Sequence, residues 1–247
     1  MKNPKAVIAG LTRNPWMPGQ ARDDNKYTLR ALAQMLRYPD AAVRGMLPGL
    51  LAAVDAEGAL HEERRTELRA LVTAMLVADP IEAEARYVEL FDRGRSTSLH
   101  LFEHVHGDSR DRGPAMIDLI KHYEAAGLRL DGKELPDHLC VVLEFASTQP
   151  PAAAREFLGE MAHILQAIFS ALRQRESSYA SLLAAVLELA GQKVEAVPVT
   201  PDEALDEAWA EPEAFGGCDT RGQAAPGQPQ PIQIVRRQPQ PPQGARP

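Results

Sequence analysis

The sequence predicts an all-α fold, a single compact domain of about nine or ten helices followed by a disordered tail rich in proline and glutamine. One reason is the composition: apolar residues make up 45% of the chain, aromatic residues only 5%, and alanine and leucine are abundant. This balance favours packed helices over a sheet. The second reason is that apolar residues recur at helical spacing, whereas no stretch alternates with period two for long enough to predict a strand.

The chain divides into four predicted regions. The last 27 residues contain seven prolines and seven glutamines and cannot bury enough apolar surface to fold. The segment before them is acidic, and its apolar anchors, Leu205 and Trp209, lie four residues apart. In order, the regions are a flexible N-terminal arm at 1–26, the helical domain at 27–190, a linker with the acidic amphipathic segment at 191–220, and the disordered tail at 221–247.

Three helices are predicted in the first part of the domain. Thr28 is a good N-cap residue, and the leucines after it share one helix face until Pro39 ends the helix. The second helix, at 40–56, contains Pro48, which predicts a kink. The third, at 61–78, places its leucines inward and its charged residues outward.

Prolines and small polar residues mark the later helices. Asp79 and Pro80 form a cap followed by a proline at the first helical position. Ser96 or Thr97 is the predicted cap of a helix that runs to His106. The remaining helices are predicted at 114–126, around 141–145, at 152–175 and at 178–190.

The charge distribution bears on the choice of partner. The formal net charge is −7, but the tail after Asp219 holds four arginines and no acid, so residues 1–219 carry 23 basic and 34 acidic residues. Nucleic acid is excluded as a partner, because phosphate binding needs a basic face. An acidic body is compatible with a partner segment that is basic and apolar.

The chain lacks the marks of secreted and membrane-inserted proteins. Cys140 and Cys218 have neither metal-ligand nor redox spacing, so neither a disulfide framework nor a metal site is predicted. The apolar run Ala6–Leu11 is shorter than that of a signal peptide, and no stretch approaches the roughly 20 apolar residues that span a bilayer. We therefore expect a soluble cytoplasmic protein without stable membrane insertion.

The stretch from Tyr87 to Arg112 is the most unusual part of the chain. It concentrates aromatic residues, histidines, arginines and carboxylates. Tyr87-Val-Glu-Leu-Phe-Asp-Arg93 and Ser98-Leu-His-Leu-Phe-Glu-His-Val-His-Gly-Asp-Ser-Arg-Asp-Arg-Gly113 closely resemble the signature of the nitrate reductase delta-subunit family. That family comprises the molybdenum-cofactor assembly chaperones of membrane-bound respiratory nitrate reductase. More weakly, the resemblance extends from about residue 27 to about residue 218.

A second motif, Leu135-Pro-Asp-His138, is followed by Glu144 and resembles an element of the wider superfamily of molybdoenzyme chaperones. We expect Asp137 to lie near a helix N-terminus, where the helix dipole favours a carboxylate. Glu144 comes seven residues later and is expected to share its face. The alternative is that Asp137 is a plain capping residue.

His100-Leu-Phe-Glu-His104 matches the inverted zinc-peptidase pattern H-x-x-E-H, in which two histidines on one helix face bind zinc. Alternatively, these residues form a polar cluster with Arg93 and Arg95 that joins two helices, or they recognise a partner. Arg110-Asp-Arg112 is either a solvated turn or a clamp for a partner. The family has no peptidase activity, so the resemblance implies no catalytic role.

The resemblance implies a system-specific chaperone that uses no cofactor of its own. Such a protein binds the apo catalytic (alpha) subunit of respiratory nitrate reductase through its N-terminal peptide and holds it competent for molybdenum-cofactor insertion before membrane attachment. Molybdenum-cofactor delivery proteins are further partners that the resemblance admits. The alternatives are a chaperone for another molybdoenzyme and a generic helical peptide-binding adaptor. The predicted client-peptide residues are Tyr87, Phe91, Arg93, His100, Phe102, Glu103, His104, Arg110, Arg112, Asp137, His138 and Glu144.

Overall fold

Helix α1 (Lys26–Met35) packs against three other helices, and its leucine, alanine and methionine side chains are fully buried. The computed structural model describes residues 6–8, 25–107, 109–132 and 134–198, with only the backbone of 6–8. These residues all belong to one unit, Met1–Asp202. A second unit, Glu203–Pro247, lies outside the described residues, as do the predicted acidic segment and tail.

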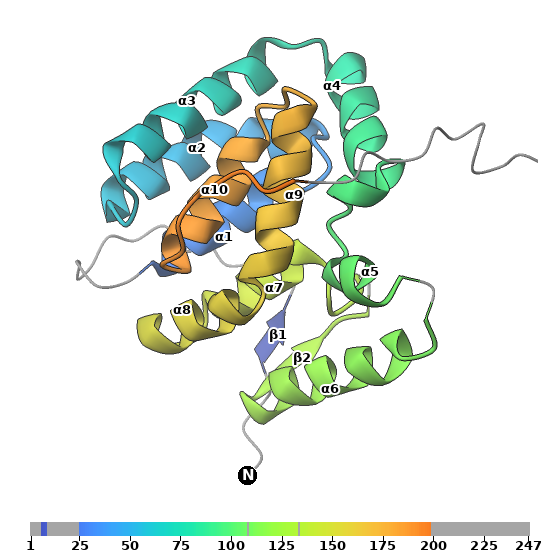
Figure 1. Ribbon diagram of the computed structural model, residues 1–247. Helices are drawn as coiled ribbons and strands as arrows, with labels where there is room; N and C mark the ends of the chain where they lie inside the picture. The colour runs from blue at the N-terminus through green and yellow to red at the C-terminus, as the bar shows by residue number, and fades with distance from the viewer. Residues whose placement is uncertain (1–5, 9–24, 108, 133, 199–247) are drawn as a thin grey trace, which may run out of the picture. The chain divides into compact units, whose positions relative to one another are not determined.

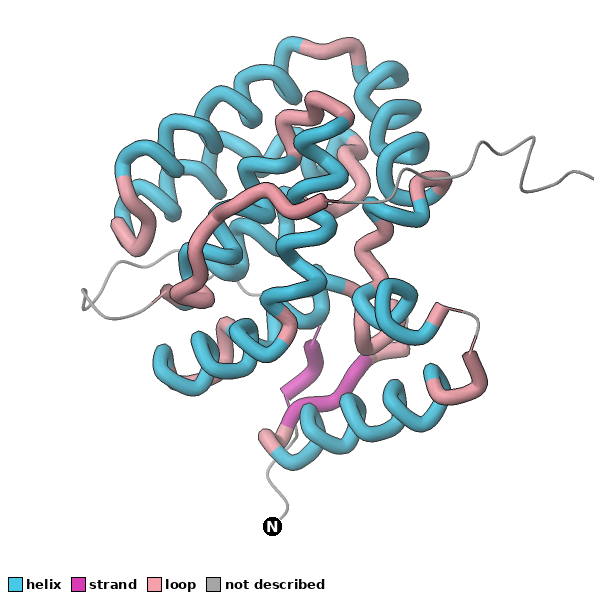
Figure 2. Tube along the Cα trace, in the orientation of Figure 1, coloured by secondary structure: helices cyan, strands magenta, loops and turns pink. Residues whose placement is uncertain are grey.

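Helices dominate the described residues (Figures 1 and 2), and the prediction of an all-α fold is confirmed. A π-helical turn at Val88–Asp92 and a 3-10 turn at Arg95–Thr97 follow α4. None of the described helices is long and apolar enough to cross a bilayer. The helices after α1 are α2 (Ala41–Glu57), α3 (Glu62–Val77), α4 (Pro80–Tyr87), α5 (Leu101–His106), α6 (Arg112–Ala125), α7 (Leu139–Ala146), α8 (Pro151–Glu160), α9 (Ala162–Gln174) and α10 (Ala180–Leu189).

Two of the predicted helix starts are confirmed by the caps that fix them. The side chain of Asp40 accepts a hydrogen bond from the backbone N–H of Val43 at 2.8 Å. Likewise, the Asp79 side chain accepts one from the N–H of Ile81 at 2.9 Å, and Pro80 is the first residue of α4. Each carboxylate satisfies an N–H that the helix itself cannot pair.

The predicted cap of the first helix is wrong. α1 begins at Lys26 with Asn25 at the N-cap position, and Thr28 is a fully buried residue of the first turn. The free N–H groups of that turn are satisfied from a distance, because the Glu57 side chain at the end of α2 accepts from the backbone N–H of Thr28 at 2.6 Å. A long-range contact therefore replaces the local cap.

The helix predicted at 152–175 is in fact two helices. α8 ends at Glu160 and α9 begins at Ala162, with Met161 between them at φ −94° and ψ 4°. The N–H of Met161 bonds to Leu158 O at 3.2 Å, a tighter turn than that of an α-helix. The two helices run in clearly different directions (Figure 1), so residues on either side of Met161 can line different surfaces.

Two short strands depart from the prediction that the chain has none. β1 (Ala6–Ile8) pairs in parallel with β2 (Leu128–Leu130), with Val7 opposite Arg129. Three residues are too few to produce a period-two pattern that sequence analysis can detect. β1 belongs to the predicted N-terminal arm and lies against α7 and β2 (Figure 1). Residues 1–5 and 9–24 of that arm lie outside the described residues.

The start of the predicted linker, at 192–198, contains no helix and contacts α9. Val197 donates its backbone N–H to Ser170 Oγ at 2.9 Å, and Val194 packs against the core. These contacts hold the chain after α10 against the helical domain as far as the structure describes it.

Candidate functional site

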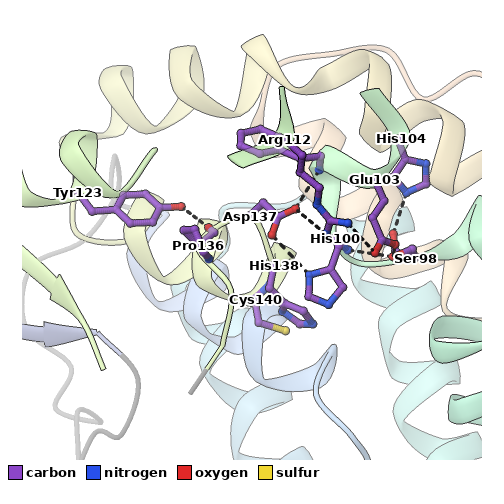
Figure 3. A network of polar contacts seen from close by, with 11 residues as sticks. Ser98, His100, Glu103, His104, Arg112, Tyr123, Pro136, Asp137, His138 and Cys140 are labelled. Carbon is purple, nitrogen blue, oxygen red and sulfur yellow. Dashed lines mark hydrogen bonds and ion pairs between the residues drawn. The ribbon is translucent and has the colours of Figure 1, made fainter. Parts of the chain in front are cut away.

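The two signature segments lie side by side where α5 and α7 begin. His100 and His138 form an antiparallel backbone bridge, and Leu101 donates its N–H to Asp137 O at 3.1 Å. The side chains that precede both helices therefore face one shared region (Figure 3).

Asp137 is the centre of this region, and its side chain is fully buried. Its Oδ2 accepts the backbone N–H of Phe102 in the first turn of α5 at 3.1 Å. Its other oxygen faces His100 Nδ1 at 3.5 Å, and Arg112 Nη2 lies 3.8 Å from Oδ2. A buried carboxylate is costly unless it is paired in this way. Asp137 thus joins α5, α6 and the turn before α7.

Asp137 lies directly before the N-cap residue of α7, near a helix N-terminus, but its side chain bonds to the first turn of α5. The capping position of α7 is held by His138, whose Nδ1 accepts the N–H of Cys140 at 3.3 Å. Asp137 comes one residue before this capping position, where the antiparallel bridge places its carboxylate next to α5. The plain capping role therefore belongs to His138.

Glu103 forms the second acidic position of the network. Ser98 Oγ donates to one of its carboxylate oxygens at 2.5 Å, and Arg112 Nη1 donates to the other at 3.2 Å. His104 Nε2 lies 2.9 Å from the backbone carbonyl of Ser98. Arg112 bridges Glu103 and Asp137, as Figure 3 shows, and so fixes the start of α6 against α5.

The pKa values of the two histidines of the bridge are shifted in opposite directions. The hydrogen bond to Asp137 raises the pKa of His100, against the opposing effect of burial. Burial lowers the pKa of His138 to about 4, and the neighbouring His100 lowers it further. A neutral His138 is also required by its hydrogen bond, since only an unprotonated Nδ1 can accept from Cys140.

The arrangement does not match an inverted zinc-peptidase site. The helix expected to start at Ser96 or Thr97 begins only at Leu101, so His100 precedes the helix and does not share a face with His104. His100 faces Asp137, and His104 meets a carbonyl. No group of three metal-binding side chains occurs among the described residues.

Two predicted peptide contacts, Tyr87 and Phe91, are in the core and are each only 6% exposed. Their ring centroids lie 4.8 Å apart, and both meet Tyr179 of the turn before α10. The Tyr87 hydroxyl donates to Leu36 O at 2.7 Å. Buried aromatic residues with these partners stabilise the fold and offer no surface to a peptide.

Three further predicted residues lie apart from the network. Glu144 is buried on α7 and accepts from Gln34 Nε2 of α1 at 3.0 Å, so it does not share a cluster with Asp137. Arg93 and Arg110 are exposed. The structure brings together His100, Phe102, Glu103, His104, Arg112, Asp137 and His138.

A largely apolar cavity of about 290 Å³ opens beside this network, at the small end of the size range of ligand sites. It lies between α5, α6, α7 and the α8–α9 break. Phe102 and Asp137 belong to both the network and the cavity. The lining residues are Leu101, Phe102, Val105, His106, Leu119, Asp137, Val142, Phe157, Glu160, Met161, His163 and Ile164.

Sequence reasoning missed the wall formed by α8 and α9. Phe157, Met161 and Ile164 recur at i, i+4 and i+7, which predicts one buried helix face. Because the helix breaks at Met161, Phe157 is only partly buried and lines the cavity. Gly159 just before the break was the available signal, since glycine weakens a helix interior.

Comparison with known proteins identifies the family. The family model described as nitrate reductase delta subunit matches residues 57–185. The chain belongs to the nitrate reductase delta-subunit family. It is 44% identical over 179 residues to the nitrate reductase molybdenum cofactor assembly chaperone NarJ of Escherichia coli K12, covering 71% of this chain and 76% of that protein.

Two further relatives carry related names. The probable chaperone NarW of Escherichia coli K12 is 37% identical, over 74% of this chain and 80% of its own length. The probable chaperone NarJ of Bacillus subtilis 168 is 31% identical, over 66% of this chain and 88% of its own length. The residues that the family model matches include the whole polar network and every residue that lines the cavity.

Proposed function

We propose that the protein is a dedicated chaperone for respiratory nitrate reductase. It binds the apo catalytic subunit, here called the client, and holds it competent for molybdenum-cofactor insertion before membrane attachment. The observation that carries this proposal is the 44% identity to a nitrate reductase molybdenum cofactor assembly chaperone over most of both chains. On this view the protein acts in the cytoplasm, and proteins that deliver the cofactor are further partners.

The cavity is suited to hold the client's N-terminal peptide. Its walls are mainly aliphatic and aromatic side chains, and polar groups are confined to a few positions. Such a site takes a small number of apolar side chains from one face of a peptide, as helical-groove binders do. The polar network then fixes the shape of the cavity, because Asp137 holds the first turn of α5 and Arg112 holds α6.

The charge near the cavity favours a basic peptide. Glu160 lies at its edge and is exposed, and the helical domain carries an excess of acid. Apolar anchors would supply most of the affinity, whereas the charges would speed association and select against acidic segments. A peptide that orders only when it binds has moderate affinity, which lets the client leave after loading.

The test is a calorimetric titration of the full-length protein with a peptide of the client's amino terminus and with a scrambled peptide. Val105→Asp places a charge on a cavity-lining residue that is 53% exposed. Ile117→Asp is the matched control, because Ile117 is 54% exposed on α6 and does not line the cavity. We expect one-to-one binding that Val105→Asp weakens by at least about tenfold and Ile117→Asp leaves unchanged.

Two outcomes would contradict the proposal. Equal heats with the scrambled peptide would show that binding does not read the client sequence. Equal losses of affinity in Val105→Asp and Ile117→Asp would show that the peptide contact lies away from the cavity.

A further inference from the structure

The edge of β2 is occupied by β1, a segment near the start of the chain. Residues 6–8 pair with residues 128–130 in a parallel ladder, and the pairing also sets β1 against α7. In the described residues this is the only sheet, and it has two strands. Extended segments are therefore accepted at this edge, because one of them is already seated there.

The pairing is weak enough to be exchanged. Three residue pairs in a parallel ladder supply only a few hydrogen bonds, and each makes a small net contribution to stability. An isolated two-stranded sheet of this length has little stability of its own in water. β1 is covalently linked to α1, and a covalent link keeps the effective concentration of a segment at its site high, on the order of millimolar for short links.

The β2 edge is continuous with the cavity. Leu128 of β2 is buried in a small cluster with Tyr123 and Phe145, and Leu119 and Phe157 pack against that cluster. Leu119 and Phe157 also line the cavity. A segment that anchors in the cavity therefore reaches side chains that support β2.

We propose that the edge of β2 is a second part of the client site, which takes an extended client segment as an added strand in place of residues 6–8. This inference rests on the function proposed above. Backbone hydrogen bonds at a strand edge bind extended peptides with little dependence on their sequence. The cavity would supply the sequence preference, and the edge would add affinity once β1 has left.

In the absence of a client, β1 then acts as a competitor built into the chain. A site that is free in a fraction f of molecules binds with an apparent Kd weaker by 1/f. If β1 fills the edge in about 90% of molecules, removing it tightens client binding by about tenfold. β1 also covers an unpaired edge that would otherwise be open to other chains.

The experiment removes the backbone pairing and keeps the chain at full length. Consecutive strand residues point their N–H groups in opposite directions, so the double change Ala6→Pro/Val7→Pro removes whichever donor faces β2. Gln20→Pro/Ala21→Pro makes the same chemical change outside the strand. Both variants are titrated with the client's amino-terminal peptide and with a synthetic peptide of residues 4–10 of this chain.

We expect Ala6→Pro/Val7→Pro to bind the client peptide about five- to tenfold more tightly than the unaltered protein, and the control to bind as the unaltered protein does. An excess of the 4–10 peptide should reverse the gain. Equal affinity in all three proteins would overturn the inference. So would a large fall in Tm in the double-proline variant alone, because β1 would then be a fixed part of the fold.

The two proposals can fail separately. If no protein binds the client peptide, the function proposed above is contradicted, and the edge is tested by the 4–10 peptide alone. Binding of that peptide to Ala6→Pro/Val7→Pro but not to the unaltered protein supports an exchangeable edge. Binding to neither protein overturns it.

Discussion

The imidazole rings of His100 and His138 meet edge to face, with their centroids 5.0 Å apart and their planes at 74°. Although they are neighbours, their pKa values move apart. His100 gains a proton more readily because it faces the buried carboxylate of Asp137. His138 resists protonation because it is buried, and its pKa falls to about 4. The bridge between α5 and α7 therefore holds one charge more easily than two.

This difference makes the stability of the fold depend on pH through His138. An unfolded histidine titrates near pH 6.5, so between about pH 6.5 and 4 the unfolded chain binds a proton that folded His138 does not. The contribution of His138 is present above pH 6.5 and is lost as the pH falls to about 4, by on the order of 3 kcal/mol. His138→Asn keeps an acceptor for the N–H of Cys140 and should lose less stability than the unaltered protein between pH 7 and 4.5.

Urea unfolding at pH 7 and at pH 4.5 measures the loss. His163→Asn changes an exposed histidine and should leave the pH dependence as it is. If His138→Asn and the unaltered protein lose the same free energy of unfolding between pH 7 and pH 4.5, burial does not lower the pKa of His138.

Asp137→Ala should destabilise the fold by about 3 to 5 kcal/mol, because it leaves the N–H of Phe102 without its acceptor and Arg112 without one of its two carboxylates. Asp118→Ala removes an exposed carboxylate on α6 that pairs with Lys121, and it should cost less than about 1 kcal/mol. Urea unfolding at pH 7 compares the two. A cost for Asp137→Ala as small as that for Asp118→Ala would mean that Asp137 does not join the helices.

Glycine is needed at position 94 because there is no room for a side chain, and not because of its backbone conformation. A Cβ at this position would lie 2.6 Å from Leu90 O and 2.7 Å from Arg175 Nη1. Gly94→Ala should therefore cost about 1 to 3 kcal/mol through overpacking. Gly45→Ala is the opposite case, because a Cβ in α2 meets nothing within 4 Å, and alanine should stabilise that helix by roughly 0.5 to 1 kcal/mol. Thermal unfolding of both variants should shift Tm in opposite directions; shifts of the same sign would contradict the packing argument.

Local features of the sequence were sufficient to predict much of the fold. Asp40 and Asp79 bond within their own first turns, so their roles follow from the neighbouring residues. Asp137 bonds to Phe102, which lies 35 positions away. Spacing along one helix cannot reveal such a partner, and for this reason the bond between Asp137 and the start of α5 is not predictable from the sequence.

The cavity was not predictable for a related reason. Phe157 and Ile164 have the spacing of a continuous buried face, and the direction of that face depends on the break at Met161. Conversely, aromatic residues in a recognisable motif attract a functional interpretation. Tyr87 and Phe91 share the motif with Glu103, yet they are packed inside the helical core.

The π-helical turn at Val88–Asp92 places one extra residue in the chain between α4 and the polar network, and Arg93 N–H reaches back to Val88 O at 3.1 Å to close it. Removing a single residue there would return the turn to ordinary α-helical pairing, because a π turn holds one residue more than an α turn. A deletion of one residue at this turn should therefore disturb the polar network less than the same deletion inside α5, where it would rotate the rest of the helix by about 100°.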